Sequence, residues 1–462
     1  MTTEIRFGTD GWRAVIGADF TFESLRRVAD AAGRVFSAEH PGGTILVGYD
    51  TRFEADSFAK AAAEVLASHG LRVLVSDAYL PTPALCWSVA RNADAIGGVM
   101  LTASHNPAEY LGFKLRMADG GASPVAFTER VEAELRPEPP TGRGAFDLVD
   151  LVGPYLADLR GLVDADAIAA AGLRVIVDPL YGAGQTYLAE TLRGLGVDVT
   201  EVHEQRNPGF GGLHPEPIIP WIDSTRELVR AGGYDAAFVT DGDADRIGAV
   251  DRSGEFVSPH RIIGLVAGHL VEDKGRTGRI VKTLSTSVLV DRYARHLGLE
   301  VTTTPIGFKW IYEEMVKGDV LIGGEESGGI GLPEHVRERD GLLMALMLTE
   351  MMAQRRKGLG ELVDDMLAIT GPMAYSRVDL KLSTEVKDAF LARAGSIAPA
   401  QIAGVEVLDI VRTDGVKFLL ADDAWLLLRP SGTEPLVRVY SEAPTAETVA
   451  ALLAAGRALV EG

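Results

Sequence analysis

Four short polar segments, each following an apolar run, contain the residues that could do chemistry in this chain. We call them the serine loop, the aspartate loop, the glutamate loop and the arginine loop. They read TASHNP (102–107), DGDADR (241–246), GEESGG (324–329) and RPSGTEP (429–435), in that order. Because their residue types differ, each segment predicts a different chemical task.

The aspartate loop has carboxylates at every second residue, Asp241, Asp243 and Asp245. Three hard oxygen donors suit Mg²⁺, which keeps further positions for water or phosphate oxygens. A calcium-binding EF-hand loop would need Gly at its sixth position and Glu at its twelfth, where this chain has Arg246 and Arg252. The sequence therefore predicts a magnesium site. Arg246 either neutralises the three acids or holds a phosphate, and we favour the phosphate.

The arginine and glutamate loops predict two kinds of ligand contact. The first offers two guanidinium groups, hydroxyl groups and the backbone around a glycine, which suit a phosphate dianion. Its candidate residues are Arg429, Ser431, Gly432, Thr433 and Arg438. In the second, Glu325 and Ser327 are alternate residues that can face the same way, and acidic acceptors suit the hydroxyl groups of a neutral polyol better than a phosphate.

The serine loop does not match the common nucleophile motifs. Ser104 lacks the flanking glycines of a G-x-S-x-G turn, and a histidine next in sequence, His105, tends to point elsewhere, which argues against a Ser–His triad. The chain has no Gly-Lys dipeptide and hence no phosphate-binding P-loop. A metal loop, a phosphate loop and a polyol loop together indicate phosphoryl transfer on a sugar. Ser104 is then the candidate carrier of the phosphate.

The elements that must position these loops follow a pattern that occurs three times. A strand, a helix and two further strands are expected in each unit, with the polar loop after the third strand. The strands are predicted at 44–50, 71–76 and 94–101, at 174–179, 197–202 and 234–240, and at 279–284, 299–304 and 319–324. Function gathers at the carboxyl ends of strands in such sheets. We therefore predict three related α/β domains with mixed sheets, whose loops face one central cleft.

After about residue 370 the pattern changes to alternating apolar and polar positions with short turns and a final helix, which predicts a smaller α+β domain. Pro- and Gly-rich segments at 136–144, 251–255 and 370–372 suggest the divisions. We expect domains over 1–145, 146–253, 254–370 and 371–462.

Composition narrows the class of partner. The 462 residues carry a net charge of −20, which disfavours nucleic acid and anionic membranes, because both select basic surfaces. Small anions remain suitable ligands, since local cations dominate within a screening length of about 8–10 Å. One cysteine, Cys86, and a start without a secretory leader predict a cytoplasmic protein. The sequence contains no pattern that indicates the oligomeric state.

The four loops, together with FGTDGWR at 7–13, resemble in order and spacing the α-D-phosphohexomutase family over essentially the whole chain. The resemblance implies four domains, the last one similar to the TATA-box-binding protein. It implies that Ser104 carries a phosphate and that Mg²⁺ is bound by the three aspartates and an oxygen of that phosphate. Glucose 1,6-bisphosphate would be the activator that first phosphorylates the serine.

The same resemblance assigns roles to single residues. Lys114 would be the general acid or base, although its residue type alone suggests an exposed surface lysine. Arg13 and His105 would line the transfer site, and Gly307 and Lys309, in TPIGFKW (304–310), would report substrate orientation. Glu325 and Ser327 would bind sugar hydroxyl groups, and the arginine-loop residues with Arg438 would bind the phosphate that is not transferred.

Within the family, GEESGG and GFKW are closer to the phosphoglucomutase and phosphomannomutase branches, so we expect glucose phosphate as substrate, with mannose phosphate as a further candidate. A phosphoglucosamine mutase is the alternative, because the FGTDG start and RPSGTEP are shared with that branch. Two rivals belong to other classes. A magnesium-dependent sugar phosphatase would not need GEESGG, and a non-catalytic sugar-phosphate sensor would not need Ser104.

Overall fold

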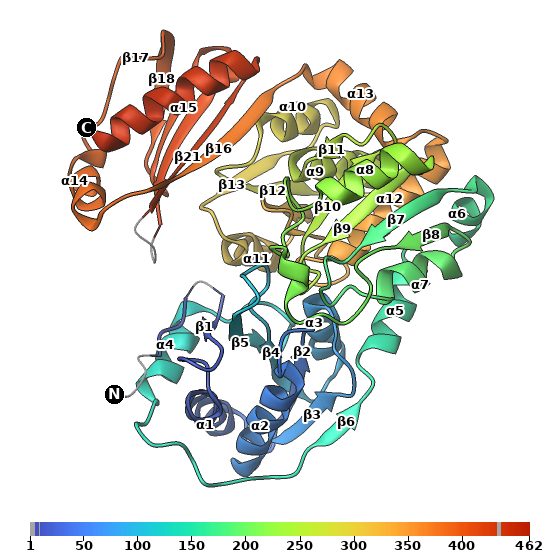
Figure 1. Ribbon diagram of the computed structural model, residues 1–462, viewed down its shortest axis with the longest axis vertical. Helices are drawn as coiled ribbons and strands as arrows, with labels where there is room; N and C mark the ends of the chain where they lie inside the picture. The colour runs from blue at the N-terminus through green and yellow to red at the C-terminus, as the bar shows by residue number, and fades with distance from the viewer. Residues whose placement is uncertain (1–4, 9, 432–435) are drawn as a thin grey trace.

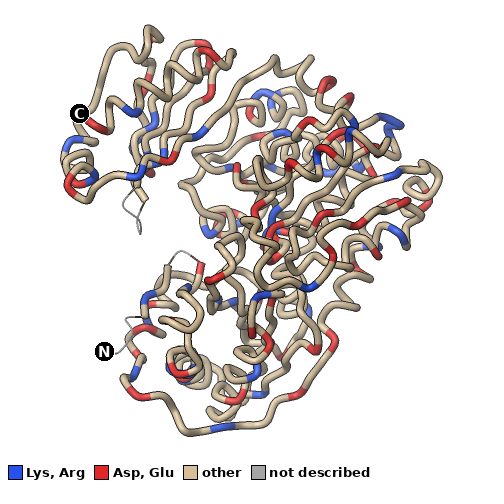
Figure 2. Tube along the Cα trace, viewed as in Figure 1, with Lys and Arg blue, Asp and Glu red and all other residues tan. Residues whose placement is uncertain are grey.

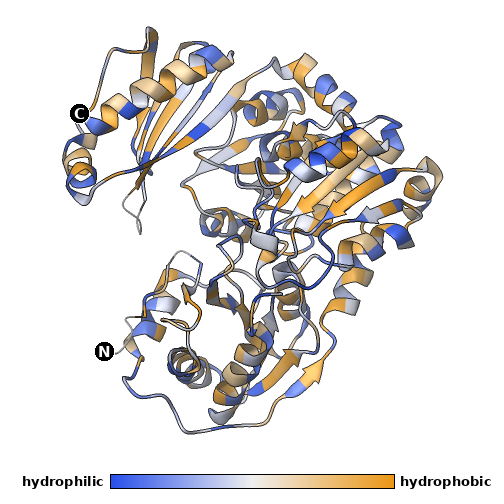
Figure 3. Ribbon diagram, viewed as in Figure 1, coloured by the Kyte–Doolittle hydropathy of each residue, from blue (hydrophilic) through white to orange (hydrophobic). Residues whose placement is uncertain are grey.

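The computed structural model describes residues 5–8, 10–431 and 436–462, which form four β-sheets in succession along the chain (Figure 1). We number them sheets I to IV. Sheet strands are mostly apolar, whereas many of the surrounding helices carry one apolar and one polar face (Figure 3). Basic and acidic residues are interspersed over every part of the molecule (Figure 2). No helix within the described part of the chain is long and apolar enough to cross a membrane.

Sheet I has the strand order β1-β5-β4-β2-β3-β6. Strand β2 runs parallel to β3 and β4, and β5 runs antiparallel to β4. Every residue of β2 is buried, which explains its continuous apolar run. The strands are β1 (Trp12–Val15), β2 (Thr44–Tyr49), β3 (Arg72–Ser76), β4 (Ala95–Leu101), β5 (Tyr110–Met117) and β6 (Asp147–Val149), and the helices are α1 (Phe22–Glu39), α2 (Ala55–Ser68), α3 (Thr82–Arg91) and α4 (Val125–Ala133).

Sheets II and III repeat the order of the middle of sheet I. The sequence β3-β2-β4-β5 in sheet I corresponds to β8-β7-β9-β10 in sheet II and to β13-β12-β14-β15 in sheet III. In each sheet the fourth of these strands is antiparallel to the third. The three related mixed sheets predicted from the sequence are thus confirmed.

The elements of these two sheets lie close to their predicted positions. Sheet II contains β7 (Arg174–Asp178), β8 (Asp198–Glu201), β9 (Ala236–Thr240), β10 (Ile247–Asp251) and β11 (Phe256–Val257), with α5 (Val152–Gly161), α6 (Ala165–Ala171), α7 (Tyr187–Gly194) and α8 (Asp223–Gly232) around it. Sheet III contains β12 (Arg279–Thr283), β13 (Val301–Thr304), β14 (Val320–Gly324) and β15 (Ile330–Gly331), with α9 (Pro259–Gly268), α10 (Val288–His296), α11 (Phe308–Lys317), α12 (Gly341–Arg355) and α13 (Leu359–Thr370).

Sheet IV is entirely antiparallel, with the order β16-β21-β20-β19-β18-β17. Leu452 and Val460 of the last helix join Val437 and Val439 of the sheet in one apolar core. This confirms the α+β class expected for the end of the chain. The elements are β16 (Ala374–Lys381), β17 (Gln401–Ile402), β18 (Val405–Val411), β19 (Val416–Leu420), β20 (Trp425–Pro430), β21 (Leu436–Ala443), α14 (Thr384–Ala394) and α15 (Ala446–Glu461).

The four parts are joined by shared cores. One large apolar core contains residues of α3, of sheets II and III, and of helix α12, so these parts pack directly against one another. Sheet IV meets sheet III through Leu284, Trp425, Leu427 and Tyr440. The domain limits expected at 145, 253 and 370 stay a prediction, and β6 at 147–149 pairs with β3 of sheet I.

Candidate active site

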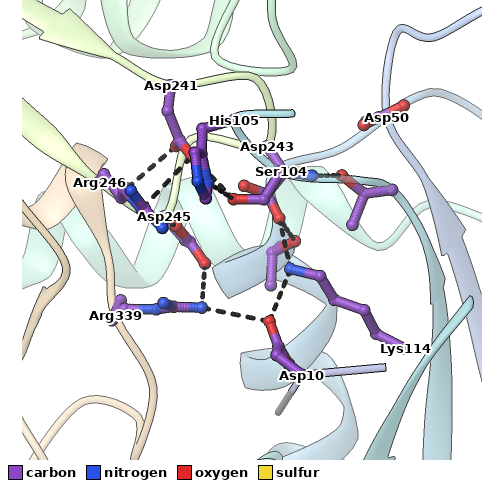
Figure 4. Close-up of polar contacts among 12 residues, drawn as sticks. Asp10, Asp50, Ser104, His105, Lys114, Asp241, Asp243, Asp245, Arg246 and Arg339 are labelled. Atoms are coloured by element: carbon purple, nitrogen blue, oxygen red, sulfur yellow. Dashed lines mark hydrogen bonds and ion pairs between the residues drawn. The ribbon is translucent and has the colours of Figure 1, made fainter. Parts of the chain in front are cut away.

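The serine loop and the aspartate loop meet where strands β4 and β9 end (Figure 4). The hydroxyl group of Ser104 donates a hydrogen bond to Oδ2 of Asp241 at 3.0 Å, and both side chains are buried. The two loops touch along the backbone as well, because a Cβ placed on Gly242 would lie 2.4 Å from the carbonyl oxygen of Ser104. Only glycine permits this approach.

Ser104 is held in a left-handed backbone conformation, with φ at +52°, which is uncommon for a residue with a side chain. Its amide donates to Oγ1 of Thr102 at 2.9 Å. Its carbonyl accepts from the guanidinium of Arg52 at 2.6 Å, and the same guanidinium donates to the carbonyls of Asn106, Pro107 and Tyr110. The serine loop is therefore fixed by one wholly buried arginine.

The three aspartates of the aspartate loop form a compact group of buried oxygen atoms. Each of Asp241, Asp243 and Asp245 can supply one oxygen such that all lie within 4.8 Å of one another. Oδ1 of Asp243 and Oδ1 of Asp245 accept no hydrogen bond from any described residue. Buried carboxylate oxygens without donors are costly unless a cation satisfies them. The residues present therefore fit a hard divalent metal ion.

Burial, mutual repulsion and neighbouring cations shift the pKa values of the three aspartates in different directions. Burial raises the pKa of Asp241 well above its usual value, and the neighbouring carboxylates raise it further. Burial raises the pKa of Asp245 to about 6, although the charge of Arg339 opposes this. For Asp243, burial is outweighed by the ammonium of Lys114 and the hydroxyl of Thr82, so its pKa lies below the usual range.

Lys114 lies next to the triad and is wholly buried, so the interpretation of this residue as an exposed surface lysine is wrong. Its ammonium group is 3.0 Å from Oδ2 of Asp243 and 2.9 Å from Oδ2 of Asp10. Burial disfavours its charge, but these two carboxylates outweigh burial and raise its pKa. The lysine is on β5, directly after the serine loop, and this short antiparallel return brings it back to the site.

His105, Arg13 and Arg246 also lie at the site. The expectation that His105 points away from Ser104 is wrong: Nδ1 lies 3.4 Å from the serine hydroxyl, because the left-handed turn at Ser104 brings the two side chains together. Burial, with the charges of Arg246 and Arg13, holds the pKa of His105 well below its usual value. Arg13 donates to the side chain of Asn106 at 3.0 Å.

Arg246 pairs with Glu216 at 3.3 Å, and its Nε lies 3.9 Å from Asp241 and 4.0 Å from Asp245. The guanidinium thus offsets part of the negative charge of the aspartate loop. Its expected contact with a phosphate stays a prediction.

The glutamate loop joins the site through Arg339. This arginine lies 2.6 Å from Oδ2 of Asp245 and 3.7 Å from Oε2 of Glu325. Burial raises the pKa of Glu325 to about 7, against the opposing charge of Arg339. The other oxygen of Glu325 accepts from the amide of Gly307 at 3.1 Å, which brings the 304–310 segment to the same place. Lys309 lies over the ring of its neighbour Trp310, and Ser327 is half-buried beside Glu325.

The arginine loop is separate from this cluster. Among the described residues, no hydrogen bond or ion pair joins Arg429 or Arg438 to the serine and aspartate loops. Arg429 instead pairs with Asp414 at 3.0 Å, and Arg438 lies 3.5 Å from Asp379. The carbonyl of Ser431 accepts from Lys387 at 2.7 Å. Gly432 and Thr433 lie outside the described residues.

Comparison with known proteins matches nearly the whole chain to one family. Residues 4–140, 153–254, 258–369 and 384–458 match the phosphoglucomutase/phosphomannomutase alpha/beta/alpha domains I, II and III and the C-terminal domain. A phosphoglucomutase/phosphomannomutase of Thermococcus kodakarensis is 32% identical over 98% of both chains. The chain belongs to the α-D-phosphohexomutase family.

Two further members illustrate the range of this phosphohexomutase's relatives. A phosphoglucosamine mutase of Frankia casuarinae is 34% identical over 97% of both chains. The crystal structure of a putative phosphomannomutase from Thermus thermophilus is 41% identical, covers all of both chains, and superposes with a TM-score of 0.90. Family membership makes the chain an enzyme of the isomerase type that transfers phosphoryl groups.

Sequence reasoning missed four residues that position the site of this phosphohexomutase. Asp10 bridges Lys114, Arg116 and Arg339, and Thr82 donates to Oδ2 of Asp243 at 2.7 Å. Arg52 had a detectable signal, because it follows β2, the parallel neighbour of the strand that precedes Ser104, so both come to the same sheet edge. Arg339 had no such signal in the sequence, since it lies in a loop far along the chain from the residues that it joins.

Proposed function

We propose that this phosphohexomutase interconverts glucose 1-phosphate and glucose 6-phosphate, with mannose phosphates as further substrates, through a phosphoserine at Ser104. The observation that carries the proposal is the hydrogen bond of 3.0 Å between the Ser104 hydroxyl and Asp241 of the buried aspartate triad. A carboxylate triad in contact with the serine hydroxyl suits a phosphate-bearing serine with a metal ion.

The metal of the proposed reaction is Mg²⁺, and Asp241, Asp243 and Asp245 would hold it together with an oxygen of the serine phosphate. When bound, Mg²⁺ neutralises charge on the phosphoryl group during transfer. The unsatisfied oxygens of Asp243 and Asp245 support this assignment. Arg246 would contact the same phosphoryl group.

The protein's own residues account for the remaining requirements of transfer. The bond between phosphorus and Oγ of Ser104 breaks, and a bond to the free hydroxyl oxygen of the hexose monophosphate forms, which yields a hexose 1,6-bisphosphate. The hydroxyl proton passes to Oγ of the serine, and Lys114, with Arg13 and His105 beside it, would mediate this transfer. Return of the other phosphate to Ser104 after the bisphosphate turns over completes the isomerisation.

Binding of the sugar is divided between two loops in this proposal. Glu325 and Ser327 would accept and donate to sugar hydroxyl groups, and Gly307 and Lys309 would sense which end of the sugar is present. The phosphate that is not transferred would be held by Arg429, Ser431, Gly432, Thr433 and Arg438. Because that phosphate is bound alike in both orientations, one arginine loop serves both halves of the reaction.

A phosphoglucosamine mutase is the second candidate, and the phosphoglucosamine mutase relative at 34% identity favours it. An assay of isomerisation with glucose, mannose and glucosamine phosphates, with Mg²⁺ and a trace of glucose 1,6-bisphosphate, separates the two. We expect glucose 1-phosphate to give the highest kcat/KM. A higher value for glucosamine 6-phosphate would assign the chain to the other branch.

Replacement of Ser104 by Ala tests the phosphoserine mechanism directly. We expect isomerisation to fall by roughly 10³-fold or more, because no residue then carries the phosphoryl group between substrates. Ser37→Ala, which removes a half-buried hydroxyl on α1, is the matched control and should keep full activity. Undiminished isomerisation in Ser104→Ala would refute the mechanism. Stoichiometric release of free phosphate by the unaltered enzyme would instead indicate a phosphatase.

A further inference from the structure

Asp414 lies in the turn between β18 and β19 and makes contacts that connect sheet IV to sheet III. The turn requires glycine at position 415, because φ is +85° and a Cβ there would lie 2.4 Å from the carbonyl oxygen of Leu428. Asp414 is half-buried, so water only partly screens its charge.

The first contact of Asp414 is with Arg429 of the arginine loop. Both carboxylate oxygens accept from Nε of Arg429 at 3.0 Å. Arg429 is directly opposite Arg438 on the neighbouring strand, and like charges opposite one another repel. Asp414 offsets this repulsion. Asp414 accepts from Nε, and the two terminal nitrogens of Arg429 donate no hydrogen bond to any described residue.

The second contact of Asp414 is with the 304–310 segment of sheet III. Oδ2 accepts from the amide of Ile306 at 3.0 Å. The next amide along the chain, that of Gly307, donates to Oε1 of Glu325 at 3.1 Å. Two consecutive amides therefore donate to two different carboxylates: one to Asp414, which binds Arg429, and the next to Glu325 of the glutamate loop. These bonds form a continuous path from the arginine loop to the glutamate loop.

We propose that Asp414 is a positioning residue that sets the separation between the phosphate-binding arginine of sheet IV and the hydroxyl-binding carboxylate of sheet III. The proposal rests on the function proposed above for Arg429 and Glu325. The consequence is selection by length: a sugar phosphate binds well only when its phosphate and its ring hydroxyl groups span the distance that this path sets. Asp414 itself does not touch the reacting atoms.

A residue that only holds sheets III and IV together would show a different behaviour, and the chain contains a matched control for it. Arg292 of α10 pairs with Asp423 of sheet IV at 2.8 Å, so this ion pair also joins the two sheets. Asp423 contacts neither the arginine loop nor the 304–310 segment in the described residues. Asp414→Ala and Asp423→Ala therefore each remove a contact between the two parts of the molecule, but only the first one affects Arg429.

Calorimetric titration with glucose 6-phosphate tests the proposal without any need for turnover. We expect Asp414→Ala to weaken binding by about 10-fold, and Asp423→Ala to change it by less than about 2-fold. In steady-state assays Asp414→Ala should raise KM by a similar factor and leave kcat within about 3-fold. Asp414→Asn, which keeps an acceptor for the Ile306 amide but loses the charge, should give an intermediate KM.

A double-mutant cycle shows whether Asp414 acts through Arg429. If it does, adding Asp414→Ala to Arg429→Ala should weaken binding by less than about 2-fold more, because the effect of Asp414 is already lost. Full multiplication of the two effects, or equal effects of Asp414→Ala and Asp423→Ala, would overturn the proposal. If the variants change glucose 6-phosphate binding as expected but the wild-type protein does not isomerise this sugar phosphate, only the proposed function is refuted.

Discussion

At the scale of single residues, the site depends on charges that are buried and satisfied by one another. Lys114 is enclosed between Asp10 and Asp243, and Arg339 connects Asp245 to Glu325. Buried charges persist only when each has partners, and removal of one partner leaves another charge uncompensated. The proposed function would therefore use residues that the fold around the site also needs.

Lys114→Gln tests this double role. We expect kcat to fall by roughly 10²–10⁴-fold, because the proton transfer loses its mediator. We expect the free energy of unfolding to fall by about 3–5 kcal/mol, because the buried carboxylate of Asp243 loses the ammonium group that compensates its charge. Steady-state kinetics and thermal denaturation measure the two effects. Lys60→Gln, on an exposed lysine paired with Asp56, is the control and should change stability by less than about 0.5 kcal/mol. A variant with normal kcat would exclude Lys114 from catalysis.

At the scale of elements, three of the candidate loops follow equivalent strands. Strands β4, β9 and β14 are each the third of their repeat, and each is followed by one of the polar loops. The serine loop and the aspartate loop then come into backbone contact at Gly242. The contact determines the distance between the serine oxygen and the carboxylates.

Gly242→Ala should separate these two loops. The added methyl group would meet the carbonyl oxygen of Ser104, which cannot move because Arg52 holds it, so we expect weaker Mg²⁺ binding and at least about a 10²-fold loss of kcat. Mg²⁺ titration of activity and of thermal stability measures the change. Gly161→Ala at the end of α5 meets no atom within 4 Å and should keep normal Mg²⁺ affinity. Equal Mg²⁺ affinity in both variants would contradict the expectation.

At the scale of the whole molecule, sheet IV is attached to sheet III through a junction with a buried lysine. Lys417 donates to the carbonyl of Leu284 at 2.6 Å and lies 4.0 Å above the ring centre of Trp425. Burial and the charge of Lys282 lower its pKa to about 7, while Glu442 and Asp291 oppose the shift. Below pH 7 the folded protein therefore carries a charged ammonium group on Lys417 in a buried position, which lowers its stability.

The pH dependence of stability should reveal this lysine. Between pH 7 and about pH 10 the unfolded chain binds a proton that the folded chain has released, so the free energy of unfolding rises with pH by about 1.4 kcal/mol per pH unit. Lys417→Met has no such group. We expect its advantage in Tm over the wild type to be largest at pH 6–7 and to narrow by pH 9. An advantage that stays constant over this range would contradict the lowered pKa.

The sequence by itself determined the class of the fold and the family, and it supplied the candidate residues for the proposed chemistry. Strand positions, the threefold repeat and the α+β end follow from local patterns of apolar residues, and these patterns reflect which side chains each element must bury. Ser104 and the three aspartates could be singled out as candidates for the same kind of reason, since these polar residues follow directly after buried strands. Because these patterns are local in the sequence, they can be recognised without knowing which segments pack against each element.

Only the tertiary structure decided which residues surround these groups. Burial of Lys114, the bridges made by Asp10 and Arg339, and the turn of His105 toward Ser104 depend on contacts between segments far apart in the chain. Asp414 is the extreme case, since a single aspartate in a turn has no motif of its own. Its role follows from its contacts with Arg429 on β20 and with Ile306 in the segment after β13, which come together only in the folded protein.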